Sequence, residues 1–291
     1  MASAAELEWW DKYADVMAEQ WFLTPDLNKL IRTEYEEDYK AYLRKDGGRL
    51  LEIGCGTGWI GMNFSALGMQ VDGTDFSEEQ LAIARRLAAE KGLDTIEFFQ
   101  RDLVNDELNG RFEKYDAVLI NAVLHHLSRE EYQTVLRNCA RILDDGGRIY
   151  IYEPINPGDS SAGRALVYPV EFMFRAFLYV INRGKFLQKQ HFLDAAATGY
   201  TGTSPDEGPI PIETITGPLR EEGLTIAEER PYHGHNLGCS MNLMRLKPRY
   251  LKLFYPMAYV FNLTDRLLFK TAGWRNYGNN RSVMCAIKAV K

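Results

Sequence analysis

The chain has 291 residues, of which 46% are apolar and 25% are charged, the composition of a globular protein with a full hydrophobic core. The formal net charge of −6 is unevenly placed, because residues 236–291 hold ten Lys or Arg and one acidic residue, whereas residues 1–235 hold 24 basic and 39 acidic residues. A basic C-terminal fifth on an acidic body indicates an anionic partner.

The cysteines and the hydropathy pattern argue against several classes of protein. The four cysteines are scattered without a C-x-x-C pair, which disfavours a zinc site or a disulfide framework and predicts a reducing compartment. The first residues, MASAAELEWWDKYADV, lack the basic start and apolar run of a signal peptide, and no stretch reaches ~20 uninterrupted apolar residues. We therefore expect a cytoplasmic protein, at most peripheral to a membrane, without a bound metal.

Residues 1–45 are expected to form an N-terminal helical cap. One helix is predicted from about Glu6 to Gln20 and a second from about Asp26 to Leu43. The segment is dense in tryptophan and tyrosine, and most of these rings are expected to pack against the domain that follows.

The stretch of residues 49–75, RLLEIGCGTGWIGMNFSALGMQVDGTD, organises the rest of the chain. A short apolar strand runs into Gly54, Gly56 and Gly58, where the missing Cβ lets the backbone turn tightly and approach a ligand. The helix that follows begins at this turn, so its first N–H groups point at the ligand. The second strand ends at Asp75, an acid suited to the two hydroxyls of a ribose. The pattern predicts a nucleoside-binding βαβ unit.

Two kinds of nucleoside cofactor are compatible with this unit. Gly56, Gly58 and Gly61 satisfy the dinucleotide fingerprint G-x-G-x-x-G of dehydrogenases. Glu52 argues against that interpretation, because a carboxylate there would repel a pyrophosphate but can hold an ammonium group through bound water. The pattern E-x-G-x-G-x-G, followed by a strand ending in Asp75, resembles the class I S-adenosylmethionine-dependent methyltransferases. The resemblance covers about residues 49–153, plus pieces of both ends.

This resemblance implies a doubly wound α/β fold with a seven-stranded, mostly parallel sheet whose last strand is antiparallel. The core is then formed by residues 46–156, 210–232 and 280–291. Further strands are expected over Thr95–Gln100, Tyr115–Asn121, Arg148–Tyr152, Leu224–Arg230 and Ser282–Val290, and further helices after capping boxes at Ser77–Gln80 and Ser128–Glu131 and over Ile212–Glu222.

The resemblance also implies where S-adenosyl-L-methionine is held. Asp102, after the third strand, matches an acid that hydrogen-bonds the adenine amino group, and Tyr13 matches a tyrosine that reaches the methionine carboxylate. Asn121 is expected to line the methionine end of the pocket. The expected cofactor-binding residues are Tyr13, Glu52, Gly54, Cys55, Gly56, Gly58, Asp75, Phe76, Asp102, Leu103 and Asn121.

Candidate catalytic residues follow the fourth and fifth strands. His125 and His126 lie beside the expected methyl position, and histidine titrates near neutrality, which suits a general base. We expect His126 to be the base and Glu153, after the fifth strand, to orient an imidazole or bind the substrate. The alternative is that a histidine here only makes a packing contact at the start of the next helix.

Two aromatic, apolar and sparsely basic segments interrupt the fold, Ala165–Leu187 and Leu243–Phe269. With their flanks, residues 157–209 and 233–279 are expected to form an inserted helical lid and substrate region. Basic residues beside aromatic ones suit an interfacial helix or a phosphate-bearing lipid. We expect a hydrophobic or lipid-linked small-molecule substrate and peripheral membrane contact. No nucleic-acid partner is expected, because a surface that follows phosphates is normally polar.

The predicted function is S-adenosylmethionine-dependent methyl transfer to an apolar or amphiphilic small molecule, at oxygen in preference to nitrogen or carbon. Three alternatives stay open at this point. One is an RNA or protein methyltransferase that docks through the basic C-terminal segment, a second is a regulator that binds the cofactor without catalysis, and the third is a dehydrogenase.

Overall fold

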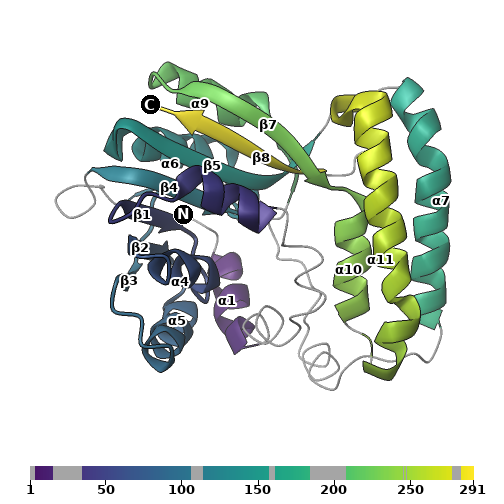
Figure 1. Cartoon of the computed structure of the whole chain (residues 1–291), viewed down its shortest axis with the longest axis horizontal. Helices are drawn as coiled ribbons and strands as arrows, with labels where there is room; N and C mark the ends of the chain where they lie inside the picture. Colours follow the sequence, from purple (N-terminus) through teal and green to yellow (C-terminus); the bar gives the residue numbers. More distant parts are fainter. Residues whose placement is uncertain are drawn as a thin grey trace.

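The computed structural model describes residues 4–15, 35–105, 114–156, 161–183, 208–244, 246, 248–276 and 283–291. Its centre is one sheet in the order β3-β2-β1-β4-β5-β8-β7, in which β8 runs antiparallel to both neighbours and the other pairs are parallel (Figure 1). The strands are β1 (Arg49–Ile53), β2 (Gln70–Asp75), β3 (Ile96–Gln100), β4 (Tyr115–Asn121), β5 (Leu143–Asn156), β6 (Ile210–Pro211), β7 (Thr225–His233) and β8 (Val283–Val290).

The expected fold class is confirmed, with two differences in detail. The sheet has eight strands because the two-residue β6 pairs with the end of β5 through Ile155 and Ile210. The fifth strand was expected over Arg148–Tyr152 but extends at both ends, from Leu143 to Asn156. A two-residue strand has no periodicity of its own, so the sequence pattern carries no sign of β6.

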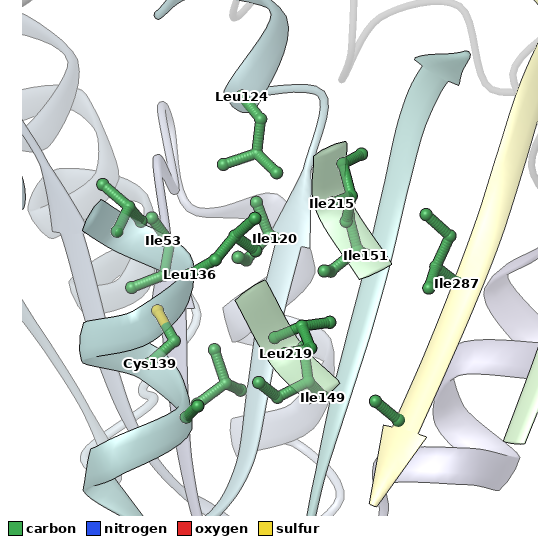
Figure 2. Packing of buried hydrophobic residues seen from close by; sticks show 14 of the residues in the cluster. Ile53, Ile120, Leu124, Leu136, Cys139, Ile149, Ile151, Ile215, Leu219 and Ile287 are labelled. Carbon is green, nitrogen blue, oxygen red and sulfur yellow. The ribbon is translucent and has the colours of Figure 1, made fainter. Parts of the chain in front are cut away.

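Helices cover both faces of the sheet, which explains why the central strands are continuous apolar runs. Ala117, Val118, Leu119 and Ile120 of β4 are all fully buried. On one face α6 (Arg129–Ile142) and α9 (Glu213–Glu221) pack through side chains such as Leu136 (Figure 2). On the other face lie α4 (Trp59–Ser65), α5 (Glu78–Glu90) and the helical residues 35–43.

The capping box predicted at Ser128–Glu131 is confirmed, whereas only one of the two hydrogen bonds of the box predicted at Ser77–Gln80 is formed. At the start of α6, Ser128 Oγ accepts from the N–H of Glu131, whose carboxylate accepts from the N–H of Ser128. At the start of α5, Ser77 Oγ accepts from the N–H of Gln80 at 3.2 Å. The expected return bond from Gln80 is not formed, because its amide turns to the loop at Gly56.

The two inserted aromatic segments are helical, as expected. The first segment lies in α7 (Ser161–Arg183), and its residues 184–187 lie outside the described residues. The second covers the end of α10 (His235–Met244) and α11 (Pro248–Leu268). These three helices pack around a cluster of their own that includes Phe174 and Phe261. The three helices stand together beyond the carboxyl end of β7 (Figure 1). At the N-terminus, α1 covers Ala4–Lys12 and the second helix is described over residues 35–43, while residues 16–20 and 26–34 of the two predicted helices lie outside the described residues.

Candidate cofactor and catalytic site

The glycine loop between β1 and α4 needs glycine for two separate reasons. Gly54 has φ +62°, and a Cβ on it would lie 2.4 Å from Val123 Cγ2. Gly58 has φ +78°, and a Cβ there would lie 2.6 Å from Phe98 Cζ. Left-handed backbone and close approach together exclude other residues at these two positions of the loop, which lies above the end of β1.

A cavity of about 570 Å³ lies over this loop, at the carboxyl ends of β1, β2 and β4. This is where open α/β sheets bind ligands. Nine of the eleven expected cofactor residues line it, and Tyr13 and Gly58 do not. The nine are Glu52, Gly54, Cys55, Gly56, Asp75, Phe76, Asp102, Leu103 and Asn121.

The two acids at the ends of β1 and β2 face the cavity and also hold the loop. Glu52 Oε2 accepts from the N–H of Gly61 at 2.8 Å, and burial raises the pKa of this carboxyl to about 8. Asp75 Oδ2 accepts from the N–H of Gly56 at 2.8 Å and Oδ1 from the N–H of Ser77 at 3.0 Å, and burial raises its pKa as well. Both carboxylates keep further lone pairs for a ligand that donates hydrogen bonds.

Two polar side chains complete the far wall of the cavity. Asp102 folds back on its own turn, accepting from the N–H of Val104 at 3.1 Å and from the amide of Asn105 at 2.8 Å. Asn121 Oδ1 is buried and has no hydrogen-bond partner among the described residues. A buried acceptor on a cavity wall is expected to pair with a ligand or an ordered water, so Asn121 marks a point where a donor of the ligand belongs.

His126 lies in the cavity wall beside the N-terminal helix. Its Nδ1 is 3.0 Å from Oε1 of Glu6, a fully buried carboxylate of α1. Trp10 Nε1 donates to the same Glu6 oxygen at 2.8 Å, and the Trp10 ring meets the His126 ring edge-on at 5.3 Å. Glu6 was missed by the sequence analysis, because one acid in a charged helix 120 positions from its partner leaves no signal in the sequence.

His125 and Glu153 do not line the cavity, so His125 is not at the expected position beside the methyl group. Glu153 contacts an imidazole, that of His125, which is one of the two roles expected of it. Glu153 is fully buried, and its Oε1 accepts from the N–H groups of Val123 and Leu124 at 2.7 and 2.8 Å. Its Oε2 is 2.8 Å from Nδ1 of His125. The carboxylate thus holds the backbone before the turn η2 (Leu124–His126), and neither side chain lines the cavity.

The N-terminal helix contributes through residues other than the one expected. Tyr13 is buried and packs edge-on against Trp9, at 5.2 Å between ring centroids, and does not line the cavity. Ala4, Leu7 and Trp10 do. Their spacing of three residues is a helical stripe, and this was the available signal that one face of the segment meets the site. Other lining residues missed from the sequence include Thr57, Trp59, Gln80, Gln100 and Arg101.

Comparison with known proteins decides between the two cofactors that the glycine pattern allows. Residues 50–147, which span the glycine loop, Asp75, Asp102 and β4, match the family described as "Methyltransferase domain". These residues form a methyltransferase domain, which supports the resemblance to the class I S-adenosylmethionine-dependent methyltransferases. The dehydrogenase interpretation is therefore wrong.

Curated relatives of this methyltransferase align over part of their length. It is 31% identical over 141 residues to the ubiquinone biosynthesis O-methyltransferase of Cereibacter sphaeroides, covering 48% of this chain and 55% of the relative. It is 30% identical over 167 residues to the protein of the same name from Dinoroseobacter shibae, covering 56% and 65%. The chain thus spans less than two thirds of the length of these relatives.

Solved structures agree in fold. Phosphoethanolamine N-methyltransferase 2 of Haemonchus contortus has a TM-score of 0.53 at 16% identity, covering 89% of this chain and 52% of that one. Geranyl diphosphate C-methyltransferase of Streptomyces coelicolor has a TM-score of 0.51 at 14% identity, covering 89% and 78%. At these identities the likeness concerns the fold alone.

The residues of the cavity fit S-adenosylmethionine. Backbone of the glycine loop at Gly54 and Gly56 forms part of the cavity wall, and the buried oxygen of Asn121 can accept a hydrogen bond from the ligand. Two buried acids suit a ligand that carries hydroxyl and ammonium donors and a positive charge. Among the described residues there is no group of three His, Cys, Asp or Glu that can hold a metal, and none of the described helices is long and apolar enough to cross a membrane.

Proposed function

We propose that this methyltransferase transfers the methyl group of S-adenosylmethionine to an oxygen of an apolar or amphiphilic small molecule. The observation that carries the proposal is the imidazole of His126 in the wall of the cavity, just beyond the carboxyl end of β4 and close to Asn121. Oxygen is favoured over nitrogen because a hydroxyl nucleophile needs a base, and because the aligned relatives are named O-methyltransferases.

Each part of the site has a separate task in this reaction. The glycine loop, Asp75 and Asp102 would hold the nucleoside, and Glu52 with Asn121 the amino-acid end of the cofactor. The bound cofactor supplies a methyl group on a positively charged sulfur, which is already activated for displacement. The protein therefore has to align the acceptor, exclude water and remove a proton. His126 takes the proton of the acceptor hydroxyl.

The test separates binding from proton removal. Purified protein is assayed for S-adenosylhomocysteine formation with long-chain catechols, phenols and primary amines of matched length. We expect the protein to turn over a hydroxyl acceptor, and we expect this turnover to fall by about 10²–10⁴-fold in His126→Ala. The calorimetric affinity of the variant for S-adenosylhomocysteine should be unchanged. Turnover of the amines alone, or equal kcat in His126→Ala, would overturn O-methylation with this base.

The helical bundle supports a lipid-linked acceptor and contact with a membrane surface. All ten exposed large apolar side chains of the described residues lie on α7 and α11. The described residues of these two helices carry three exposed charged side chains, Arg175, Lys252 and Arg266, and all are basic. The apolar residues are Leu166, Tyr168, Phe172, Tyr179, Val180, Leu253, Tyr259, Val260, Leu263 and Leu267.

We call these ten residues and the three basic ones the α7/α11 surface. An apolar surface that also carries positive charge suits an anionic lipid bilayer, where aromatic and aliphatic side chains enter the headgroup region and basic ones meet phosphates. A second copy is a poorer occupant, because a symmetric contact would bring the same basic residues of both copies together. The apolar content of the α7/α11 surface also disfavours nucleic acid as the partner that binds there.

A further inference from the structure

The N-terminal helix α1 bridges two sides of the cavity. Ala4, Leu7 and Trp10 line the cavity, and at the far end of the helix Asp11 Oδ1 accepts from Ser77 Oγ at 2.5 Å. Ser77 follows β2, whereas His126, the partner of Glu6, follows β4, and these strands flank β1 on opposite sides. The helix therefore crosses the mouth of the site and is fastened on both sides of the glycine loop.

Two hydrogen-bonding groups, the Trp10 indole N–H and His126 Nδ1, contact the Glu6 carboxylate where α1 passes over the cavity. The carboxylate is fully buried, and a buried charge is costly unless it is paired and hydrogen-bonded. Its Oε1 receives the Trp10 indole N–H at 2.8 Å and lies 3.0 Å from His126 Nδ1. The Trp10 donor comes from the same helix, whereas His126 ties the carboxylate to the methyltransferase core.

The neighbouring imidazoles are each paired with a different glutamate. The rings of His125 and His126 lie 3.9 Å apart between centroids, with Glu153 at Nδ1 of the first and Glu6 at Nδ1 of the second. A carboxylate at Nδ1 selects the Nδ1–H tautomer, in which Nε2 is the nitrogen that can accept a proton. It also stabilises the imidazolium that forms when the proton arrives.

We infer that Glu6 is the positioning residue for His126, holding the imidazole in the tautomer that accepts the acceptor's proton, so that the base is complete only when α1 covers the cavity. This inference rests on the proposed role of His126. Covering of the cavity by α1 and orientation of the base are thereby coupled, because the same helix carries the carboxylate that holds His126. Glu6 acts through His126 and is not itself required to touch the acceptor.

A double-mutant cycle tests this coupling. Glu6→Gln keeps the size of the side chain and its acceptor for Trp10 but removes the charge. With the acceptor of highest turnover from the catechol and phenol panel, we expect kcat to fall about 10²-fold or more, while KM and the affinity for S-adenosylhomocysteine change less than about threefold. In a His126→Ala background the same substitution is expected to have no further effect. Glu6→Asp should recover part of the loss.

The outcomes separate this inference from the proposed function. Equal losses from Glu6→Gln in both backgrounds would assign Glu6 to folding of α1 and overturn the inference. A loss in His126→Ala alone, with none in Glu6→Gln, would overturn the inference and keep the base. No loss in His126→Ala would overturn the proposed function itself. Glu8→Gln, an exposed neighbour on the same helix, is the matched control and should leave kcat unchanged.

A second readout does not depend on turnover. Imidazole nitrogen chemical shifts of the cofactor-free protein, labelled in histidine, report the tautomer of His126 directly. We expect the Nδ1–H form in the unchanged protein and in Glu8→Gln, and a shift toward the Nε2–H form in Glu6→Gln. An identical His126 tautomer in all three proteins would overturn the inference.

Discussion

Asp75 Oδ2 accepts the backbone N–H of Gly56 at 2.8 Å, which joins the end of β2 to the glycine loop after β1. The acid that the sequence suggests as a ribose ligand is therefore also a support for the loop that meets the rest of the nucleoside. Since its other oxygen accepts from the N–H of Ser77, the carboxylate is oriented before any ligand arrives. Such pre-orientation lowers the entropic cost of binding.

Replacing Asp75 by alanine is expected to weaken binding of S-adenosylhomocysteine by about 1–3 kcal/mol, through loss of charge-assisted hydrogen bonds to the ribose and loosening of the loop. Isothermal titration calorimetry measures this directly. Asp94→Ala removes an exposed acid just before β3 and serves as the control, with unchanged affinity. An affinity in Asp75→Ala equal to that of the control would show that the carboxylate does not contact the ligand.

Glu52 predicts a pH dependence of stability in the cofactor-free protein. Burial raises its pKa from 4.5 to about 8, only partly offset by the Gly61 N–H, and the nearby charge of Asp75 adds to the rise. The native state then binds more protons than the unfolded chain between these values, so the carboxyl's contribution to stability is lost as pH rises toward 8. The slope attributable to one such group is at most about 1.4 kcal/mol per pH unit.

The measurement is the free energy of unfolding in urea at several pH values between 5 and 8.5, for the unchanged protein and for Glu52→Gln. The variant cannot ionise at this position, so its free energy of unfolding should decline less with pH. Parallel curves for the two proteins would contradict the raised pKa. Comparing differences between the two proteins removes the contributions of all other titrating groups.

The sequence predicts the features of this protein that depend on local patterns. The apolar runs of β1 to β4 and the glycine loop were located almost to the residue, because burial on both faces and left-handed turns each restrict residue types. The pairing of Glu6 with His126 could not be found in this way, since it depends on where a distant helix docks. Glu153 was expected directly after the fifth strand but lies within β5, and the direction of its side chain depends on the backbone N–H groups after β4.

Adding negative charge to the α7/α11 surface is expected to abolish membrane binding. The unchanged protein should co-sediment with vesicles that contain anionic phospholipid, and less with purely zwitterionic vesicles. Phe172→Glu combined with Leu263→Glu places two acids among the exposed apolar side chains of α7 and α11, and should remove sedimentation. Thr225→Glu adds an acid on the exposed β7 and is the control.

Two results would contradict the membrane assignment. One is failure of the unchanged protein to sediment with anionic vesicles at low ionic strength, where electrostatic attraction is strongest. The other is a dimer in solution that the Phe172→Glu, Leu263→Glu protein cannot form, which would assign the α7/α11 surface to a second copy of the chain. Analytical ultracentrifugation of the same three proteins distinguishes these outcomes.

Asp265 is expected to fix the helical bundle to the sheet. This fully buried carboxylate of α11 accepts the N–H groups of Gly234, His235 and Asn236, at 2.9, 3.1 and 2.8 Å, and so caps α10 directly after β7. Asp265→Ala leaves three N–H groups at a buried helix start without their acceptor. We expect unfolding in urea to become easier by about 2–4 kcal/mol.

The affinity for S-adenosylhomocysteine should be retained in Asp265→Ala, because no residue of α10 or α11 is among the described residues that line the cavity. Thr264→Ala is the matched control. It removes a hydroxyl that bonds only within its own helix, to the carbonyl of Phe261. The free energy of unfolding should therefore fall by well under half of the loss expected for Asp265→Ala. Equal destabilisation by the two substitutions would show that the cap is not what joins the bundle to β7. A loss of cofactor affinity in Asp265→Ala alone would instead show that the bundle helps to form the site.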